Sequence, residues 1–533
     1  QNYYWQMRYV GFSSQFHDAG LSIIEEDGSV SFAAHAERYT KVKNDPRLPY
    51  QLMELIKDDD VVSFYEDIET RSKLHNIRKE VFPTQMKSMS QGVTRAGNYG
   101  YVPEEIEGTY DVSHMHHESH VAQSLYTCPW ETNDDIVMVS IDGAGEEQTS
   151  VIYDANFNVI DDVHDPQSIG KIYGHVTRTL GYKPLEHEYI VMGLSSYAEP
   201  DKKLVQFFTD YYESFSQYTR EEFLRLKYTL NQKALEKVKS GEVRGANLSN
   251  VYYRFPTMIA DFEYNFIERL WKISWEYDAK VIAASVQEFT ENKILEIMRT
   301  ARKHGSKLVY SGGCAQNIIV NSKIKDMFDD VHIAIAPSDA GSSLGCAAKT
   351  WAEETGGKRL KWSPYLGYDI KNKINPKEVV DYLMKNKVCG VANGRAEFGP
   401  RALGNRSLLG DVRYDIKDTV NKIKKRELFR PFAPAILEEY ADEYFDGHKN
   451  EYMQYTCNAK HDYKSVIHVD GTSRCQVVKK DCQSVLRQIL EEYYERTGVP
   501  MLLNTSLNIK GQPMLNDEQD VKEWQSKYNV RIF

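Results

Sequence analysis

Two histidines lie four residues apart in HMHHESHVAQSLY, residues 114–126. On a helix, His116 and His120 would share one face, where two imidazoles can bind one metal ion. Asp339 is a candidate third ligand, because it follows an apolar run and precedes a glycine in APSDAGSSLG. Two histidines and a carboxylate with open positions suit iron(II), and zinc also accepts such ligands. The alternative interpretation is a polar helix with solvated histidines.

Glycines end two apolar runs of the chain. Asp142 and Gly143 follow IVMVSI in the first run, and Gly312 and Gly313 follow KLVYS in the second. Such turns free backbone N–H groups for phosphate and let a nucleotide approach the backbone. One such turn is weak evidence, since many strands end in glycine. Two of them, with GFSSQFHDAG near the start, resemble the paired phosphate loops of actin-like ATPases.

Basic residues gather between glycines and prolines in the last third of the chain. They lie in segments 393–413, 421–436 and 468–478, and include Arg395, Arg401, Arg406, Arg413, Lys424, Arg426, Arg430 and Arg474. Guanidinium groups bind phosphate and carboxylate bidentately. Because this spacing does not match one helix face, we expect loops that line an anion site, and not a solvated charge run. The run PMLLN then ends in hydroxyl and amide groups suited to a nucleotide phosphate, on Thr505, Ser506 and Asn508.

Strands and helices must bring these groups together. Residues 7–35 predict a β-hairpin that turns at Asp27-Gly28, and residues 135–154 predict a second one. Segments 307–324 and 331–354 each predict a strand, a glycine turn and a helix. Strands that alternate with helices and close on Asp or Gly indicate an α/β domain with its site along the strand ends.

The chain has 533 residues, so we expect two or three domains. The predicted divisions are a domain from 7 to 355, a linker over 356–369 and a second domain over 370–533. Segment 201–260, rich in charge and tyrosine, predicts a helical insertion. The opening QNYYWQM is similar to a protease tag site, so residues 1–6 are expected to be a tag remnant and Met7 the native start; the alternative is a natural strand.

Composition excludes some classes of protein. Hydrophobic residues make up 41% and charged residues 27%, which is typical of a globular protein. We find no apolar run of about 18 residues, so no membrane span is expected. The formal net charge of −11 disfavours nonspecific nucleic-acid binding. Seven cysteines without a CxxC pair favour the reducing cytoplasm.

Four segments in order, EFGPRALGNRSLLGDVR, KKRELFRPFAPAI, HVDGTSRCQ and LLNTSLNIKGQP, resemble the carbamoyltransferase family of nodulation-protein, cephalosporin, novobiocin and tobramycin carbamoyltransferases. The resemblance implies a metal-dependent, actin-like N-terminal domain with a duplicated ribonuclease-H-like fold. It implies a C-terminal α/β domain similar to threonylcarbamoyl-adenylate synthase. There carbamoyl-AMP would form from carbamoyl phosphate and Mg²⁺-bound ATP. The N-terminal domain would then carbamoylate a hydroxyl of a sugar, an antibiotic or a hydroxymethylated nucleotide. The resemblance is also compatible with a homodimer.

The resemblance also implies roles by position. His17 and Asp18 match the family's HD pair near the acceptor, where His17 would take the hydroxyl proton. Glu37 and Arg38 match its ERxT segment. The implied metal ligands are His116, His120 and Asp339. The implied nucleotide turns contain Asp142, Gly143, Gly312, Gly313 and Asn317. The implied adenylate-forming pocket contains Arg401, Lys424, Arg430, Thr505, Ser506 and Asn508.

The chain departs from the family pattern at three places. Ile190 stands where lysine is usual, GLSSY replaces GLAPYG, and Leu507 replaces a common phenylalanine. Two other functions remain open, a tRNA threonylcarbamoyl transferase and an actin-like kinase or regulator. The net acidity and GPRALGNRS count against the first, and the second leaves the C-terminal arginines without a role.

Overall fold

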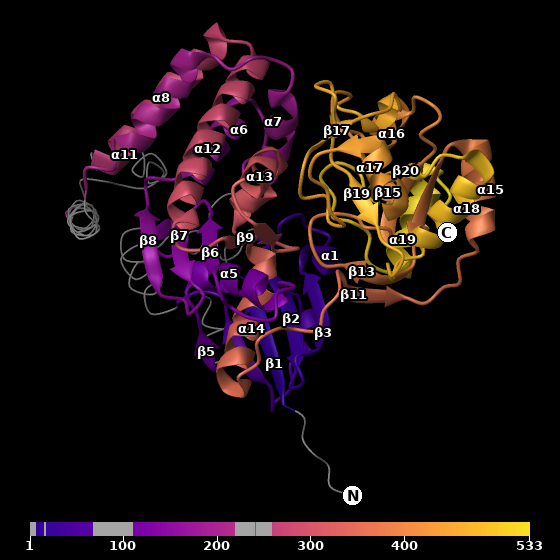
Figure 1. The fold of residues 1–533 in the computed structure, drawn as a ribbon, viewed down its shortest axis with the longest axis horizontal. Coiled ribbons are helices and arrows are strands. Elements are labelled where there is room, and N and C mark those ends of the chain that lie inside the picture. The colour runs from indigo at the N-terminus through magenta and orange to yellow at the C-terminus, as the bar shows by residue number, and fades with distance from the viewer. Residues whose placement is uncertain (1–6, 15–16, 68–109, 219–239, 241–257) are drawn as a thin grey trace, which may run out of the picture.

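The computed structural model in Figure 1 describes residues 7–14, 17–67, 110–218, 240 and 258–533. The expected tag remnant, 1–6, lies outside the described residues, as does most of the expected insertion, 201–260. At the edges of that insertion the structure describes α8 (Lys202–Glu213) and the start of α11 (Met258–Glu276). In the described part of the chain, no helix combines the length and the apolar character that a membrane span needs.

The first part of the chain forms two five-stranded sheets with the same topology. Their orders are β3-β2-β1-β4-β5 and β8-β7-β6-β9-β10. In each, three antiparallel strands are followed by two strands parallel to the first. The strands are β1 (Arg8–Ser13), β2 (Gly20–Glu25), β3 (Val30–His35), β4 (Val61–Phe64), β5 (Val112–Ser113), β6 (Ile136–Ile141), β7 (Gln148–Asp154), β8 (Val159–His164), β9 (Lys307–Ser311) and β10 (Asp330–Ile333).

This repetition confirms the duplicated α/β fold. Both predicted hairpins form, β1–β2 and β6–β7, and they occupy equivalent places in the two sheets. Each sheet is also followed by one helix at an equivalent place, α5 (His116–Thr127) after β5 and α14 (Asp339–Thr355) after β10. The two helices that carry the candidate metal ligands are therefore related by the duplication.

Helices α5 and α14 pack against one another at unusually short range. A Cβ atom on Gly345 would overlap the carbonyl oxygen of Ser119, and one on Gly341 would overlap the amide of Gln123 and the carbonyl of Ala336. Only glycine permits this approach. The close approach brings Asp339, at the start of α14, within 3.7 Å of His116 Nε2 and 3.4 Å of His120 Nε2 on α5.

We expect Gly345→Ala to destabilise the fold by at least about 2 kcal/mol, because the added methyl must push α5 and α14 apart. Bound metal should fall in the same variant. Thermal melting and elemental analysis measure the two effects. Gly174→Ala is the matched control, since its Cβ would meet no atom closer than 3.7 Å. Equal melting temperatures for Gly345→Ala and the wild type would contradict the close packing.

Helices cover the second sheet on its upper side in Figure 1. Phe266 of α11 stacks on Phe207 and Tyr211 of α8, with ring centroids 5.2 and 3.9 Å apart. The other helices of this part are α6 (Ile169–Thr179), α7 (Glu188–Ser195), α12 (Ala279–Arg302) and α13 (Ile318–Lys325).

The C-terminal part forms a separate sheet of order β12-β14-β20-β15-β19, coloured orange to yellow in Figure 1. Its strands are β12 (Val388–Ala392), β14 (Arg406–Gly410), β20 (Met501–Ser506), β15 (Ala433–Leu437) and β19 (Gln476–Val478). Its longer helices are α15 (Pro376–Asn386), α16 (Lys417–Ile423), α18 (Leu486–Thr497) and α19 (Glu518–Tyr528). A small sheet of β16 (Phe445–Asp446), β17 (Cys457–Ala459) and β18 (Thr472–Ser473) lies beside it.

Residues 356–370 connect the two parts. Helix α14 ends at Gly356, which has the left-handed φ of 71° that favours glycine. The N–H of Leu360 then donates to the carbonyl of Tyr126 at 2.8 Å. Residues Tyr365–Ile370 form β11, which pairs with β13 (Gly394–Glu397). The connection is therefore ordered against both parts.

Candidate active sites

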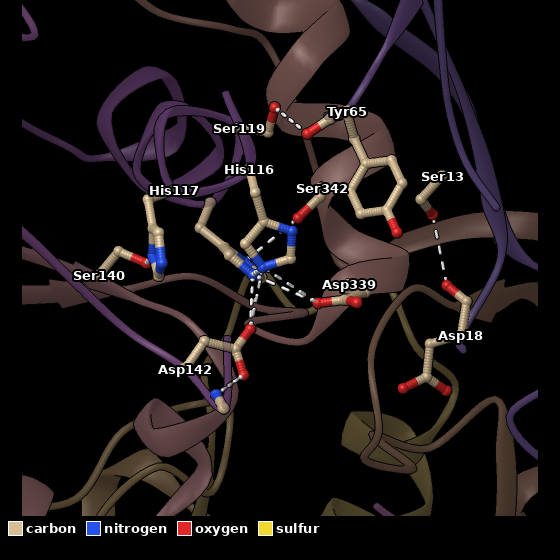
Figure 2. A network of polar contacts seen from close by, with 12 residues as sticks. Ser13, Asp18, Tyr65, His116, His117, Ser119, Ser140, Asp142, Asp339 and Ser342 are labelled. Atoms are coloured by element: carbon tan, nitrogen blue, oxygen red, sulfur yellow. Dashed lines mark hydrogen bonds and ion pairs between the residues drawn. The ribbon is translucent and has the colours of Figure 1, made fainter. Parts of the chain in front are cut away.

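Four side chains from three places in the chain converge in the N-terminal part. The Nε2 atoms of His116 and His120 lie 3.1 Å apart. Asp142, which follows β6, places Oδ2 2.9 Å from His120 Nε2, and Asp339 places Oδ1 3.4 Å from it. One ligand atom from each residue lies within 4.8 Å of the others. In Figure 2, Asp142 and Asp339 approach the ring of His116 from different sides.

The second ring nitrogen of each histidine is held by a neighbour. His116 Nδ1 lies 3.3 Å from a carboxylate oxygen of Glu66, and His120 Nδ1 lies 3.2 Å from the hydroxyl of Ser342. Such contacts fix the ring orientation and leave Nε2 for a ligand. Two facing imidazole nitrogens and two buried carboxylates fit a divalent cation. These residues therefore form a candidate metal centre, and Asp142, predicted for a nucleotide turn, adds a fourth candidate ligand to it.

His17 and Asp18 lie beside this centre, in the loop between β1 and β2. His17 Nδ1 is 3.0 Å from Asp18 Oδ2, and its Nε2 is 3.4 Å from Asp339 Oδ2. Burial lowers the pKa of His17, but Asp339 and Asp18 outweigh it and raise the pKa to about 10. The structure thus brings the predicted HD pair next to the predicted metal ligands.

The glycine turns also border the centre. The N–H of Gly143 donates to Asp142 Oδ1 at 2.6 Å. A Cβ on Gly313 would lie 2.9 Å from the same oxygen, and Gly312 has a φ of 93°. Asn317, the remaining predicted nucleotide contact, caps α13 and exchanges hydrogen bonds of 3.0 and 3.1 Å with Gln287.

Three arginines of the C-terminal segments contact protein groups and not an open anion site. Arg406 is fully buried and donates to backbone carbonyls, among them those of Asn516 and Tyr368 at 2.9 Å. Arg395 donates to the carbonyls of Ser31 and Leu366, each at 2.6 Å. Arg413 forms an ion pair with Asp411 at 2.7 Å. The expectation that these three line an anion site is wrong, because Arg406 has every donor nitrogen occupied and Arg395 and Arg413 each have Nε and Nη2 occupied.

Five other cations form a group that we call the cation cluster, with Lys424 buried and the four arginines half-buried: Arg401, Lys424, Arg426, Arg430 and Arg474. Among the residues that the structure describes, the side chain of Arg401 has no hydrogen-bond partner and the buried Nε of Arg474 has no acceptor. Burial and the neighbouring positive charges lower the pKa of Arg401 to about 10 and lower those of Arg426, Arg474 and Lys424 well below their usual values. Within the described residues, the cluster's ion pair is that of Arg430 with Glu427, at 3.5 Å.

The end of β20 borders the cation cluster. Lys424 Nζ donates to the backbone carbonyl of Ser506 and, at 2.9 Å, to Asn508 Oδ1. The hydroxyl of Ser506 donates to the same Asn508 oxygen at 2.7 Å. Thr505, which lies in β20 opposite Leu408, is partly exposed. The structure thus joins Lys424, Ser506 and Asn508, all predicted for the adenylate-forming pocket.

Helix α7 of the N-terminal part reaches the cation cluster. The guanidinium of Arg430 lies 4.7 Å from the ring centroid of Tyr189. The carbonyls of Phe429 and Gly193 accept hydrogen bonds across the same boundary, from Tyr197 at 3.0 Å and from His468 at 2.9 Å. Ile190, which replaces the family lysine, is 1% exposed. An apolar residue suits this buried position.

Sequence reasoning missed three residues of these sites. Asp142 was assigned to a nucleotide turn, and Glu66 and Tyr189 were not considered. Glu66 could have been found, since it follows the apolar run VVSFY just as Asp142 follows IVMVSI. Tyr189 carries no such signal, because its contact with Arg430 depends on how the two parts meet.

Family models decide the identity of the chain. A model described as the carbamoyltransferase N-terminus matches residues 8–348, and one described as the carbamoyltransferase C-terminus matches residues 380–533. The chain belongs to the carbamoyltransferase family. As an enzyme, it is a carbamoyltransferase.

Relatives of this carbamoyltransferase include named nodulation proteins. Nodulation protein NolO of Bradyrhizobium diazoefficiens is 29% identical over 76% of the chain and 74% of the relative. Nodulation protein U of Rhizobium tropici is 34% identical over 46% of each chain. An uncharacterised protein of Methanocaldococcus jannaschii is 27% identical over 95% of the chain and 94% of its own length. Among solved structures, component A of (R)-2-hydroxyglutaryl-CoA dehydratase from Acidaminococcus fermentans matches with a TM-score of 0.34 and 10% identity, over 66% of this chain and 100% of its own.

Proposed function

We propose that this carbamoyltransferase works in two steps at two sites. Carbamoyl phosphate and Mg²⁺-bound ATP react at the cation cluster to give carbamoyl-AMP, phosphate and pyrophosphate. The carbamoyl group is then transferred to a hydroxyl of a small acceptor, with release of AMP, in the N-terminal part beside the residues that would hold the metal. The family assignment supports carbamoyl transfer, and the two clusters support its division into two steps. The cysteine content supports the cytoplasm as the place of reaction.

The cation cluster is the observation that carries the proposal. Burying several positive charges without counter-ions is costly, whereas phosphate groups bind arginine through strong charge-assisted hydrogen bonds. Arg401 and Arg474 have donors to offer, since no group of the described part of the chain occupies Arg401 or the Nε of Arg474. Carbamoyl phosphate and the ATP triphosphate together carry the negative charge that such a cluster requires. Neutralising that charge also lowers the repulsion that opposes attack on phosphorus.

The first step balances with one water molecule. Water releases phosphate from carbamoyl phosphate and leaves carbamate. An oxygen of carbamate then attacks the α-phosphorus of ATP, and the bond to pyrophosphate breaks. The product, carbamoyl-AMP, is labile in water, so a buried site protects it. Lys424 donates to Ser506 and Asn508, so its expected role is to hold the end of β20 beside the cluster.

For the second step, His116, His120, Asp142 and Asp339 would hold a divalent cation. We propose iron(II), the metal that best suits histidine and carboxylate ligands with open positions. When bound, such a cation supplies Lewis-acid stabilisation for the carbamoyl carbonyl or the phosphate. His17 takes the proton of the acceptor hydroxyl. A cation bound by Asp339 would offset the negative charge that raises the pKa of His17. It would therefore favour the neutral imidazole that a general base needs.

We expect His17→Ala to lower carbamoyl transfer at least about a hundredfold, the usual effect of losing a general base. Formation of carbamoyl-AMP, measured as pyrophosphate release, should stay within about twofold, since His17 lies in the other part of the chain. His448→Ala, at a half-exposed histidine of the C-terminal part, serves as the control. If pyrophosphate release also stopped in His17→Ala, the assigned role would be wrong.

The acceptor class is tested by supplying ¹³C-labelled carbamoyl phosphate, ATP and candidate hydroxyl compounds, with detection by mass spectrometry. Aminoglycosides, other sugars and hydroxymethylated nucleotides are the first candidates. The proposal expects one acceptor to gain a single labelled carbamoyl group, and only when ATP is present. A labelled product that forms equally well without ATP would contradict it.

A further inference from the structure

Arg38 lies in the short helix α1 (Glu37–Thr40), where the N-terminal part meets the C-terminal part. In Figure 1, α1 lies next to the strands β11 and β13. Its guanidinium Nη2 donates two long hydrogen bonds to backbone carbonyls of the facing loop, to Gly399 at 3.3 Å and to Glu397 at 3.5 Å. That loop continues directly to Arg401 of the cation cluster. Arg38 is therefore a side chain of one part that contacts the anion-binding loop of the other.

Most donors of Arg38 have no protein acceptor. The side chain is 3% exposed, and its Nε and Nη1 atoms have no hydrogen-bond partner. It forms no ion pair within the described residues. The carboxylate of its neighbour Glu37 is occupied by Lys43 Nζ and by the N–H of Asn44, each at 2.9 Å. Because a buried guanidinium is costly without acceptors, its free donors point to an anionic ligand.

The segments that flank Arg38 also contact the loops that lead to the transfer site. The residue two positions before Arg38, Ala36, donates its N–H to the carbonyl of Ala19 at 2.7 Å, next to Asp18. On the other side, a Cβ on Gly399 would lie 2.7 Å from the carbonyl of Ile335, four residues before Asp339. These contacts place Arg38 between the loops of the transfer site and the loop of the cation cluster.

We propose that Arg38 binds a phosphate group on the transfer side of this boundary, in a position distinct from the cation cluster. The ligand would be the phosphate of carbamoyl-AMP and then of AMP, so this assignment rests on the proposed function. Nη2 keeps the guanidinium against the loop of Glu397 and Gly399, while Nε and Nη1 donate to phosphate oxygens. Loss of the side chain then weakens the hold on the adenylate during transfer.

The test measures AMP binding by calorimetry in an Arg401→Gln background, which weakens the cation cluster. Adding Arg38→Gln should weaken AMP binding at least tenfold. Adding Arg395→Gln, the matched control, should change AMP affinity less than twofold. Arg395 also donates across the boundary to a backbone carbonyl, but its hydrogen bonds are short, at 2.6 Å, and leave it in a structural role. Arg38→Lys keeps the charge but lacks the second donor group, so it should weaken AMP binding at least threefold. This variant replaces Arg38→Gln as the test if the glutamine variant does not fold.

Equal AMP affinity with and without Arg38→Gln would overturn the proposal, as would equal losses in the Arg38 and Arg395 variants. In the first case the free donors of Arg38 take no part in binding AMP. In the second, the arginines serve only to hold the two parts together. A wild type that releases no pyrophosphate from ATP and carbamoyl phosphate would overturn the proposed function separately, because AMP binding dependent on Arg38 would remain measurable.

Discussion

Arg401→Gln is expected to lower pyrophosphate release from ATP and carbamoyl phosphate at least about a hundredfold. Removing one donor that stabilises developing charge typically costs about 10² to 10³ in rate. The side chain of Arg401 makes no hydrogen bond with the residues that the structure describes, so its loss breaks no hydrogen bond among them. Removing one of several repelling buried cations should instead raise the melting temperature. A loss of activity together with unchanged or increased stability would identify Arg401 as a binding group for the substrates.

Arg413→Gln is the control for that variant. Arg413 belongs to the same arginine-rich segment, but its guanidinium is paired with Asp411 at 2.7 Å. We therefore expect it to affect stability and to leave pyrophosphate release within about threefold. Similar rates for the Arg401 and Arg413 variants would contradict the division between substrate-binding and structural arginines.

His120→Ala is expected to reduce metal affinity at least about a hundredfold, since even supporting residues of metal ligands change affinity 10- to 100-fold. The physical reason is the loss of a buried Nε2 that faces Asp142 at 2.9 Å and Asp339 at 3.4 Å. Carbamoyl transfer should disappear with the metal. Pyrophosphate release should remain, because the cation cluster lies in the other part of the chain. Elemental analysis after dialysis and the two partial assays measure these effects.

Asp142→Asn extends the same experiment to the fourth candidate ligand. If Asp142 binds the metal, the variant should lose metal nearly as strongly as His120→Ala. His117→Gln serves as the comparison, because His117 lies in the same helix but contacts Ser140 at 2.7 Å and the carbonyl of Gln148 at 3.0 Å. Full metal content in both His120→Ala and Asp142→Asn would exclude the proposed centre.

Sequence reasoning predicted the parts of the fold that depend on local pattern. The hairpins at 7–35 and 135–154 follow from alternating apolar residues and turn signals, and both form. The pairing of His116 with His120 follows from helical spacing. The place of Asp142 does not follow from spacing, because it depends on the duplication that sets the β1–β2 and β6–β7 loops against the same two helices. That duplication is visible in the strand order and leaves no repeat in the sequence.

The arginines show a second limit of sequence reasoning. Arg401 and Arg406 stand five residues apart in one glycine-rich segment, yet Arg406 donates to buried carbonyls whereas Arg401 has no hydrogen-bond partner among the described residues. Which of them is free depends on loops folded over them from residues 368 and 516, far away in the chain. Tyr189 and Arg38 reach the C-terminal part in the same way, through contacts between the two parts of the chain.

The central claim, that the chain activates the carbamoyl group as an adenylate, is tested most directly by the products formed from ATP. ATP would be incubated with the wild type, with and without carbamoyl phosphate, and AMP, ADP, phosphate and pyrophosphate would be quantified. The two-step account predicts pyrophosphate that depends on carbamoyl phosphate, with AMP released as the adenylate is consumed, and no ADP. Release of ADP without pyrophosphate would contradict it and would identify a kinase-type reaction.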